Sequence, residues 1–211
     1  MSEEKHLEAL HDIRKIMDRS TRFLSLSGLS GIAAGIIALI GTSIGYIILT
    51  EYVILHNDLS IHRWSETEDF IQKLVITAIC TLSSALLAAL YFTYRKAQKL
   101  GNRMWDRSSK RLLINLIIPL LIGGVFCLSL IWNNLFYLVP SATLIFYGLG
   151  LINSSKYTLP EIQTLGIFQT TLGLGGCFLP EYSFLLWGAG FGLLHIIYGS
   201  VMYFKYERQT K

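Results

Sequence analysis

The residue of this chain best placed to carry chemistry is His195, because it lies inside a long apolar stretch. Gly188, Gly192 and Gly199 surround it at steps of four, three and four residues, which places the set on one helix face. An ionisable side chain deep in a membrane is costly and is a functional candidate by default, for example as a proton carrier. The alternative is a neutral imidazole that bonds to a neighbouring helix. We favour this structural interpretation because the sequence offers no evident charged partner.

Polar residues of the preceding apolar stretches are the candidate partners of this histidine. They are Tyr147 and Asn153, Gln169 and Thr170, and Asn115 further back. With His195, the first four form the predicted intramembrane polar site. Glu161 follows Pro160, where a carboxylate favours the positive end of a helix, so we interpret it as a cap before a proton carrier.

No sequence motif of a known catalytic or cofactor site is present. The chain lacks a nucleophile elbow, a P-loop, a dinucleotide fingerprint, HExxH and CxxC. The runs GAGFG and GLGG lie within apolar stretches, where glycines predict helix packing. The segment Glu51–Asp69 carries potential metal ligands in a spacing that matches no standard pattern, namely His56, Asp58, His62, Glu66, Glu68 and Asp69. We therefore predict no catalytic residue, no metal site and no cofactor.

The composition indicates an integral membrane protein. Of 211 residues, 52% are hydrophobic and 15% are charged, whereas soluble domains carry about 25% charged residues. The charges also cluster and leave long uncharged runs, which is typical of helical membrane proteins. The three cysteines all fall in such runs and predict no disulfide framework.

These runs predict an all-helical bundle of six membrane spans. An amphipathic cytosolic helix occupies residues 1–22, with apolar positions at three- and four-residue steps, and a cytosolic tail occupies 205–211. The expected spans are 23–50, 70–94, 112–132, 137–153, 161–178 and 183–204. Small residues follow one face of the first span at steps of three and four, which predicts close helix packing through Gly28, Gly31, Gly35, Ala38, Thr42 and Gly45.

The basic hinge Arg95–Arg111 sets the predicted threading, because it holds seven Lys and Arg between two spans. With six spans, both termini and this hinge lie on one side, which collects sixteen of the 18 Lys and Arg. Arg63 and Lys73 remain on the other side. By the positive-inside rule the richer side is cytosolic. The net charge of +4 then needs no nucleic-acid partner.

Three segments carry a resemblance to a known family: RSTRFLSLSGLSGIAAG (19–35), YGLGLINSSKYTLPEIQTLG (147–166) and WGAGFGLLHIIYG (187–199). They resemble a family of small bacterial inner-membrane proteins of unknown function. The resemblance implies a multi-helix protein of the bacterial inner membrane, with no activity or substrate to carry over.

The leading functional hypothesis is a non-enzymatic accessory, sensor or interaction protein. It would pack with itself or with a membrane or cytosolic partner, besides the lipid bilayer. One alternative is a small transporter or channel with a polar path around His195, Gln169, Tyr147 and Asn153. A weaker alternative is a membrane enzyme acting on a lipid or isoprenoid, with His195 as acid and base.

Overall fold

The computed structural model describes residues 26–56, 64–101 and 105–208. These residues form helices and their connections, with no strand among them, so the all-helical prediction is confirmed for this part of the chain. The amphipathic helix predicted for residues 1–22 lies outside the described residues. The helices are α2 (Gly28–His56), α3 (Trp64–Lys99), α4 (Arg107–Trp132), α5 (Val139–Ser154), α6 (Glu161–Phe178), α7 (Ser183–Trp187), the π-helix η4 (Gly188–Leu194) and α8 (His195–Tyr206). Short 3₁₀ turns η1 (Phe136–Leu138), η2 (Ser155–Tyr157) and η3 (Pro180–Tyr182) complete the set.

Five helical segments of the described chain are long and apolar enough to cross a membrane. They are Gly28–Tyr52, Glu68–Lys99, Arg107–Trp132, Phe136–Tyr157 and Pro180–Tyr206. The helix α6 is not among them, although 161–178 is one of the six predicted spans. Its 18 residues include one glutamate, two glutamines and four glycines.

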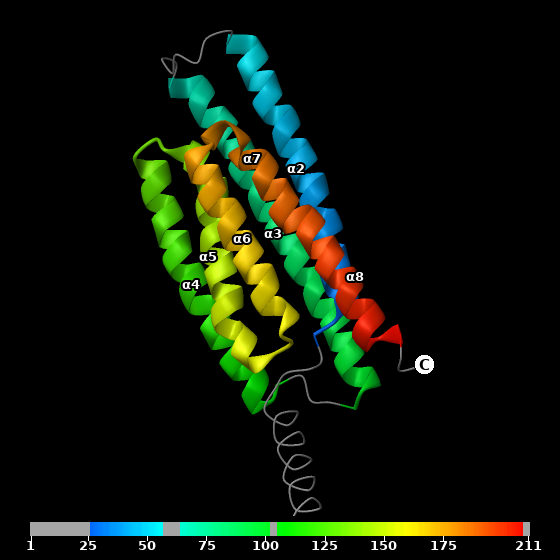
Figure 1. Cartoon of the computed structure of the whole chain (residues 1–211). Coiled ribbons are helices and arrows are strands. Elements are labelled where there is room, and N and C mark those ends of the chain that lie inside the picture. The colour runs from blue at the N-terminus through cyan, green and yellow to red at the C-terminus, as the bar shows by residue number, and fades with distance from the viewer. Residues whose placement is uncertain (1–25, 57–63, 102–104, 209–211) are drawn as a thin grey trace, which may run out of the picture.

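The helices form two groups that α7, η4 and α8 connect (Figure 1). In the first group, α5 packs between α4 and α6. In the second, α2 packs against α3, η4 and α8. Because α7 also contacts α5 and α6, the continuous α7–η4–α8 segment joins the two groups.

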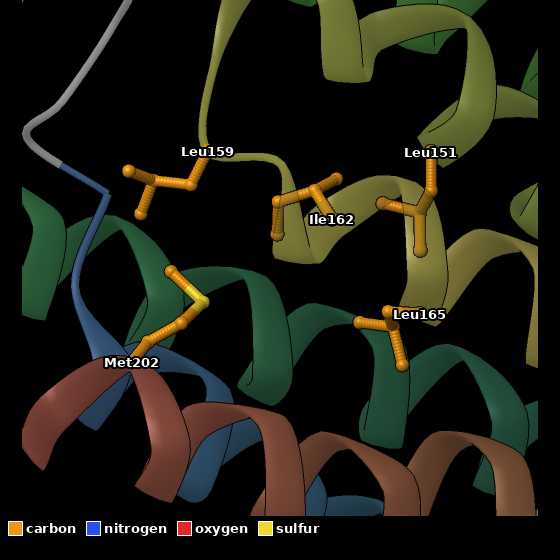
Figure 2. Close-up of a cluster of buried hydrophobic side chains, with 5 residues drawn as sticks. All are labelled: Leu151, Leu159, Ile162, Leu165 and Met202. Carbon is orange, nitrogen blue, oxygen red and sulfur yellow. The ribbon is translucent and has the colours of Figure 1, made fainter. Parts of the chain in front are cut away.

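The described Lys and Arg other than Lys73 gather at one end of the bundle, which we call the basic end. There α3 ends and α4 begins, and the lower ends of α5, α6 and α8 lie beside them (Figure 1). An apolar cluster fills the space between α5, α6 and α8 at this level, and Figure 2 shows Met202 of α8 facing Leu159 and Ile162. Its buried members are Leu151, Leu159, Ile162, Leu165 and Met202.

Two segments that lie between predicted spans are largely helical. In Glu51–Asp69, α2 continues to His56 and α3 begins at Trp64. A helix satisfies its own backbone in water as well as in lipid, so it need not stop at the membrane edge. The stacked rings of Tyr52 and Phe70, 4.3 Å apart, connect the two extended ends.

The basic hinge is also mostly helix, because α3 runs to Lys99 and α4 starts at Arg107. Asp106 begins α4 with a capping box: its carboxylate accepts from the Ser109 N–H at 2.6 Å, and the Ser109 hydroxyl accepts from the Asp106 N–H at 2.9 Å. Such a box satisfies two backbone donors at the helix start.

Candidate functional site

His195 stands at the junction of a π-helix and an α-helix, near the middle of the α7–η4–α8 segment. The seven-residue π-helix Gly188–Leu194 precedes it directly. A π-helix widens the turn and leaves backbone carbonyls available to other donors, and such segments recur at functional sites. His195 is 7% exposed and Gln169, on α6 opposite, is fully buried.

The imidazole is bonded at both nitrogens. Its Nδ1 lies 3.1 Å from the Gly190 carbonyl oxygen, and its Nε2 lies 3.0 Å from the Tyr147 hydroxyl on α5. A carbonyl can only accept, so Nδ1 carries the proton when it bonds to Gly190. In the neutral ring, Nε2 then accepts from the Tyr147 hydroxyl. None of these partners is charged.

Gln169 binds the same backbone carbonyl from the other side. Its Nε2 donates to the Gly190 oxygen at 2.9 Å and lies 3.3 Å from His195 Nδ1. Since Nδ1 already donates to Gly190, the 3.3 Å approach joins two donors and is not itself a hydrogen bond. The Gln169 Oε1 is buried with no hydrogen-bond partner. One carbonyl of the π-helix therefore gathers two side chains from two helices.

Aromatic rings enclose the polar centre on the α5 side. Phe191 lies 5.0 Å from Tyr147, 4.9 Å from Trp187 and 5.8 Å from His195, measured between ring centroids. The Trp187 indole N–H donates to the Thr143 hydroxyl at 3.1 Å. Rings at these separations attract one another and keep the centre apolar around its few polar atoms.

Three of the five residues predicted for the polar site lie together, and two lie elsewhere. His195, Gln169 and Tyr147 form the centre just described. The Thr170 hydroxyl donates to the Gly166 carbonyl of its own helix at 2.9 Å. The Asn153 amide donates to the Asn115 carbonyl at 3.1 Å, which ties α5 to α4.

The three glycines predicted to share a face with His195 form a glycine groove, but the histidine ring does not lie in it. Gly188, Gly192 and Gly199 face α2, where they meet Thr42, Leu39 and Ile32. On α2, a Cβ at Gly31 would lie 3.1 Å from the Gly199 Cα, and one at Gly35 would lie 2.7 Å from the Gly192 oxygen. These glycines therefore let α2 and α8 approach closely, as small residues do in membranes. The imidazole points instead toward α5 and α6.

A second polar cluster, which the sequence did not reveal, connects the helix ends at the basic end. The Glu207 carboxylate accepts from the Gly28 N–H at 2.6 Å and from the Ser27 hydroxyl at 3.2 Å. Lys96 of α3 lies 3.3 Å from the same carboxylate and donates to the Leu26 carbonyl at 2.6 Å. Both charged side chains are largely buried, at 11% and 14% exposed.

Glu161 joins this end of the bundle through a different pair of contacts. Its carboxylate lies 2.6 Å from Lys205 Nζ and accepts from the Tyr206 hydroxyl at 2.9 Å. It thus links the start of α6 to the end of α8, in addition to its place in the first turn of α6. In the sequence, these contacts could have been suspected from the run Lys205–Tyr206–Glu207, which follows directly on an apolar span.

Nothing in the described residues assembles a metal site, since no group of three His, Cys, Asp or Glu converges there. Of the residues of Glu51–Asp69 considered as ligands, Asp58 and His62 lie outside the described part, and so do the side chains of His56 and Glu66. The centre around His195 joins α8, α6 and α5 through hydrogen bonds between neutral groups. No family model matches this chain, and neither the curated proteins nor the solved structures yield a significant match.

Proposed function

We propose that this chain is a non-enzymatic, multi-pass membrane protein that works by association, with a second copy of itself as the first partner. The observation that carries the proposal is α3, which packs against α2 and leaves the rest of its long apolar surface uncovered. Exposed side chains follow its outer side, including Ile79, Leu86, Leu87 and Leu90.

The middle of this outer side contains hydroxyl groups that bond to no described residue. On the opposite side, Thr81 faces Gly41 of α2, and Thr77 lies one turn before it; both donate to carbonyls of their own helix, at 2.7 and 2.8 Å. Ser83 and Ser84 are exposed and make no such bond within the described residues. A hydroxyl that faces lipid has no partner there, whereas a second α3 can supply one. Small side chains also let two helices approach closely, and a two-fold contact is the commonest symmetry of oligomers.

The buried centre around His195 supports a structural role over transport or catalysis. Both ring nitrogens are occupied by neutral groups, and the ring is 7% exposed. A proton carrier or acid–base group needs access to the proton it moves. We therefore assign His195, Gln169 and Tyr147 to holding α8 against α5 and α6.

We further propose six spans in a bacterial inner membrane, with the basic end in the cytosol and α6 as the fifth span. Nine of the ten Lys and Arg in the described residues lie at that end, and Lys73 alone lies away from it. This segregation is what the positive-inside rule predicts for the cytosolic side. The resemblance of three segments to small bacterial inner-membrane proteins agrees with it. Cytosolic docking through residues 1–22 stays a prediction.

Disulfide crosslinking in membranes tests the association. In a background with Cys80, Cys127 and Cys177 changed to alanine, a single cysteine is placed at Ser83 or Leu87, on the outer side of α3. The matched control is Leu121→Cys on α4, since Leu121 is 65% exposed and Leu87 is 69% exposed. We expect oxidation to give a dimer from the α3 positions and none from the control.

Two results would overturn the proposal. One is the absence of a dimer from both α3 positions when the proteins are inserted normally. The other is equal crosslinking from α4, which would mean random collision. The structural role of His195 has its own test. If the wild type carries a measurable flux of a solute across the membrane, and a His195→Asn variant folds but loses that flux, the transporter hypothesis is restored.

A further inference from the structure

The ends of α3 and α8 repeat one arrangement of an arginine over an aromatic ring. On α3, the Arg95 guanidinium carbon lies 5.7 Å from the centroid of the Tyr91 ring, four residues earlier. After α8, the Arg208 guanidinium carbon lies 5.8 Å from the centroid of Phe204, again four residues earlier. Both rings are about half exposed, at 55% and 56%. The two arginines are therefore held at the bundle surface, each next to an exposed ring.

An ion pair sets the two arginines at the same level of the bundle. Lys96 follows Arg95, Glu207 precedes Arg208, and Lys96 and Glu207 lie 3.3 Å apart. Figure 1 shows the end of α3 and the end of α8 close together at the basic end. Lys99, one turn beyond Arg95, is exposed there as well.

The described carboxylates at this end are already engaged within the fold. Glu207 binds Lys96 and the start of α2, Glu161 binds Lys205 and Tyr206, and Asp106 caps α4. Among the described residues, no carboxylate forms an ion pair with Arg95, Lys99 or Arg208. The corner between α3 and α8 thus presents positive charge that no described carboxylate pairs with, beside exposed apolar surface.

We propose that this corner, formed by Arg95, Lys99 and Arg208 with the rings of Tyr91 and Phe204, binds the headgroup of an anionic phospholipid. Arginines at the end of a membrane helix extend to the level of the headgroups, and aromatic rings favour the same interface. A phosphate accepts paired hydrogen bonds from guanidinium groups, and the acyl chains then lie along the exposed apolar face of α8. This inference concerns lipid selection and stands apart from the association through α3.

Native mass spectrometry of the full chain with defined lipids tests the proposal. Phosphatidylglycerol is the anionic probe and phosphatidylcholine the neutral one. We expect the wild type to retain phosphatidylglycerol preferentially and the R95Q/R208Q variant to bind it about 25-fold more weakly, since each basic residue beside the headgroup contributes about fivefold. Binding of phosphatidylcholine should stay unchanged.

The matched control is K110Q/K156Q, which removes the same charge from the basic end at α4 and η2 instead. It should keep at least half of the wild-type affinity for phosphatidylglycerol. The R95K/R208K variant keeps the charge and should retain most of the binding. Each arginine lies over a ring four residues earlier and forms no ion pair with a described residue, so we expect the variants to melt like the wild type.

Three outcomes would overturn the proposal. The wild type could hold both lipids equally, or the two double glutamine variants could weaken binding equally, which would reduce the effect to net charge. The third is a preference for phosphatidylglycerol that survives R95Q/R208Q and disappears on deletion of residues 1–22, which would place the lipid on that segment.

Discussion

Near the middle of the bundle α8 is held by neutral groups, whereas at the basic end it is held by charges. His195 bonds to a hydroxyl and a backbone carbonyl among aromatic rings. A dozen residues later, Glu207 binds a lysine and a backbone N–H, and Lys205 binds Glu161. Charge is costly away from water, so a tie in the middle must be neutral, while one at the end can be ionic.

Breaking the ion pair between Glu207 and Lys96 should lower the free energy of unfolding more than breaking the neutral hydrogen bonds around His195. Glu207→Ala removes the cap of α2 and leaves Lys96 largely buried without a counter-charge. We expect the free energy of unfolding to fall by about 3 kcal/mol, as for other buried pairs that lose one partner. Reversible unfolding in mild detergent would measure it.

Two variants show whether the burial of this pair is the cause. Lys96→Met added to Glu207→Ala should recover part of the loss, because the unpaired cation is gone. Lys205→Met breaks a pair whose lysine is 57% exposed, and should cost only about 0.5 kcal/mol. Equal losses from Glu207→Ala and Lys205→Met would contradict the distinction between buried and exposed ties.

The packing around the neutral hydrogen bonds can be disturbed by a substitution in the π-helix that changes no polar side chain. A Cβ at Gly190 would lie 2.5 Å from both Gln169 Oε1 and Leu144 Cδ2. We expect Gly190→Ala to destabilise the protein by about 2 kcal/mol, as overpacking does. In Gly175→Ala, the new methyl meets nothing within 4 Å, so stability should hold or rise slightly. Thermal melting of the pair would decide, and equal midpoints would refute the close packing at Gly190.

Removing a single hydroxyl from the neutral tie should have the smallest effect. Tyr147→Phe leaves His195 Nε2 without its donor, and we expect a loss of about 1 kcal/mol. Nitrogen-15 NMR of His195 should show the proton on Nδ1 in the wild type. Tyr137→Phe is the control, since that ring is half exposed and its hydroxyl makes no described bond. A wild-type spectrum with the proton on Nε2 would reverse the assigned donor and acceptor.

The sequence predicted part of the polar centre because helical periodicity restricts which side chains face inward. Gln169 shares an inward face with Gly166, Gly173 and Gly176, and Tyr147 lies on the side of α5 toward His195. Thr170 is one residue beyond Gln169, about 100° around the helix, so both cannot reach the same ring. Asn153 is six residues beyond Tyr147, at another level of the bundle.

The remaining features depend on distant contacts or on backbone geometry. The wider turn of the π-helix points the histidine ring away from the glycine groove. A prediction that assumes 3.6 residues per turn throughout cannot foresee this difference in direction. Lys96 and Glu207 come from separate spans, so no local pattern pairs them. The helices α2 and α3 extend beyond the predicted spans because hydropathy locates the apolar part of a helix and not its ends.

The start of α2 is completed by the far end of the chain. Its first N–H is capped by a carboxylate that is synthesised 179 residues later, and its glycines pack against α8. During translation, this helix must therefore remain in the bilayer without its cap or its main packing partner until α8 and Glu207 have left the ribosome.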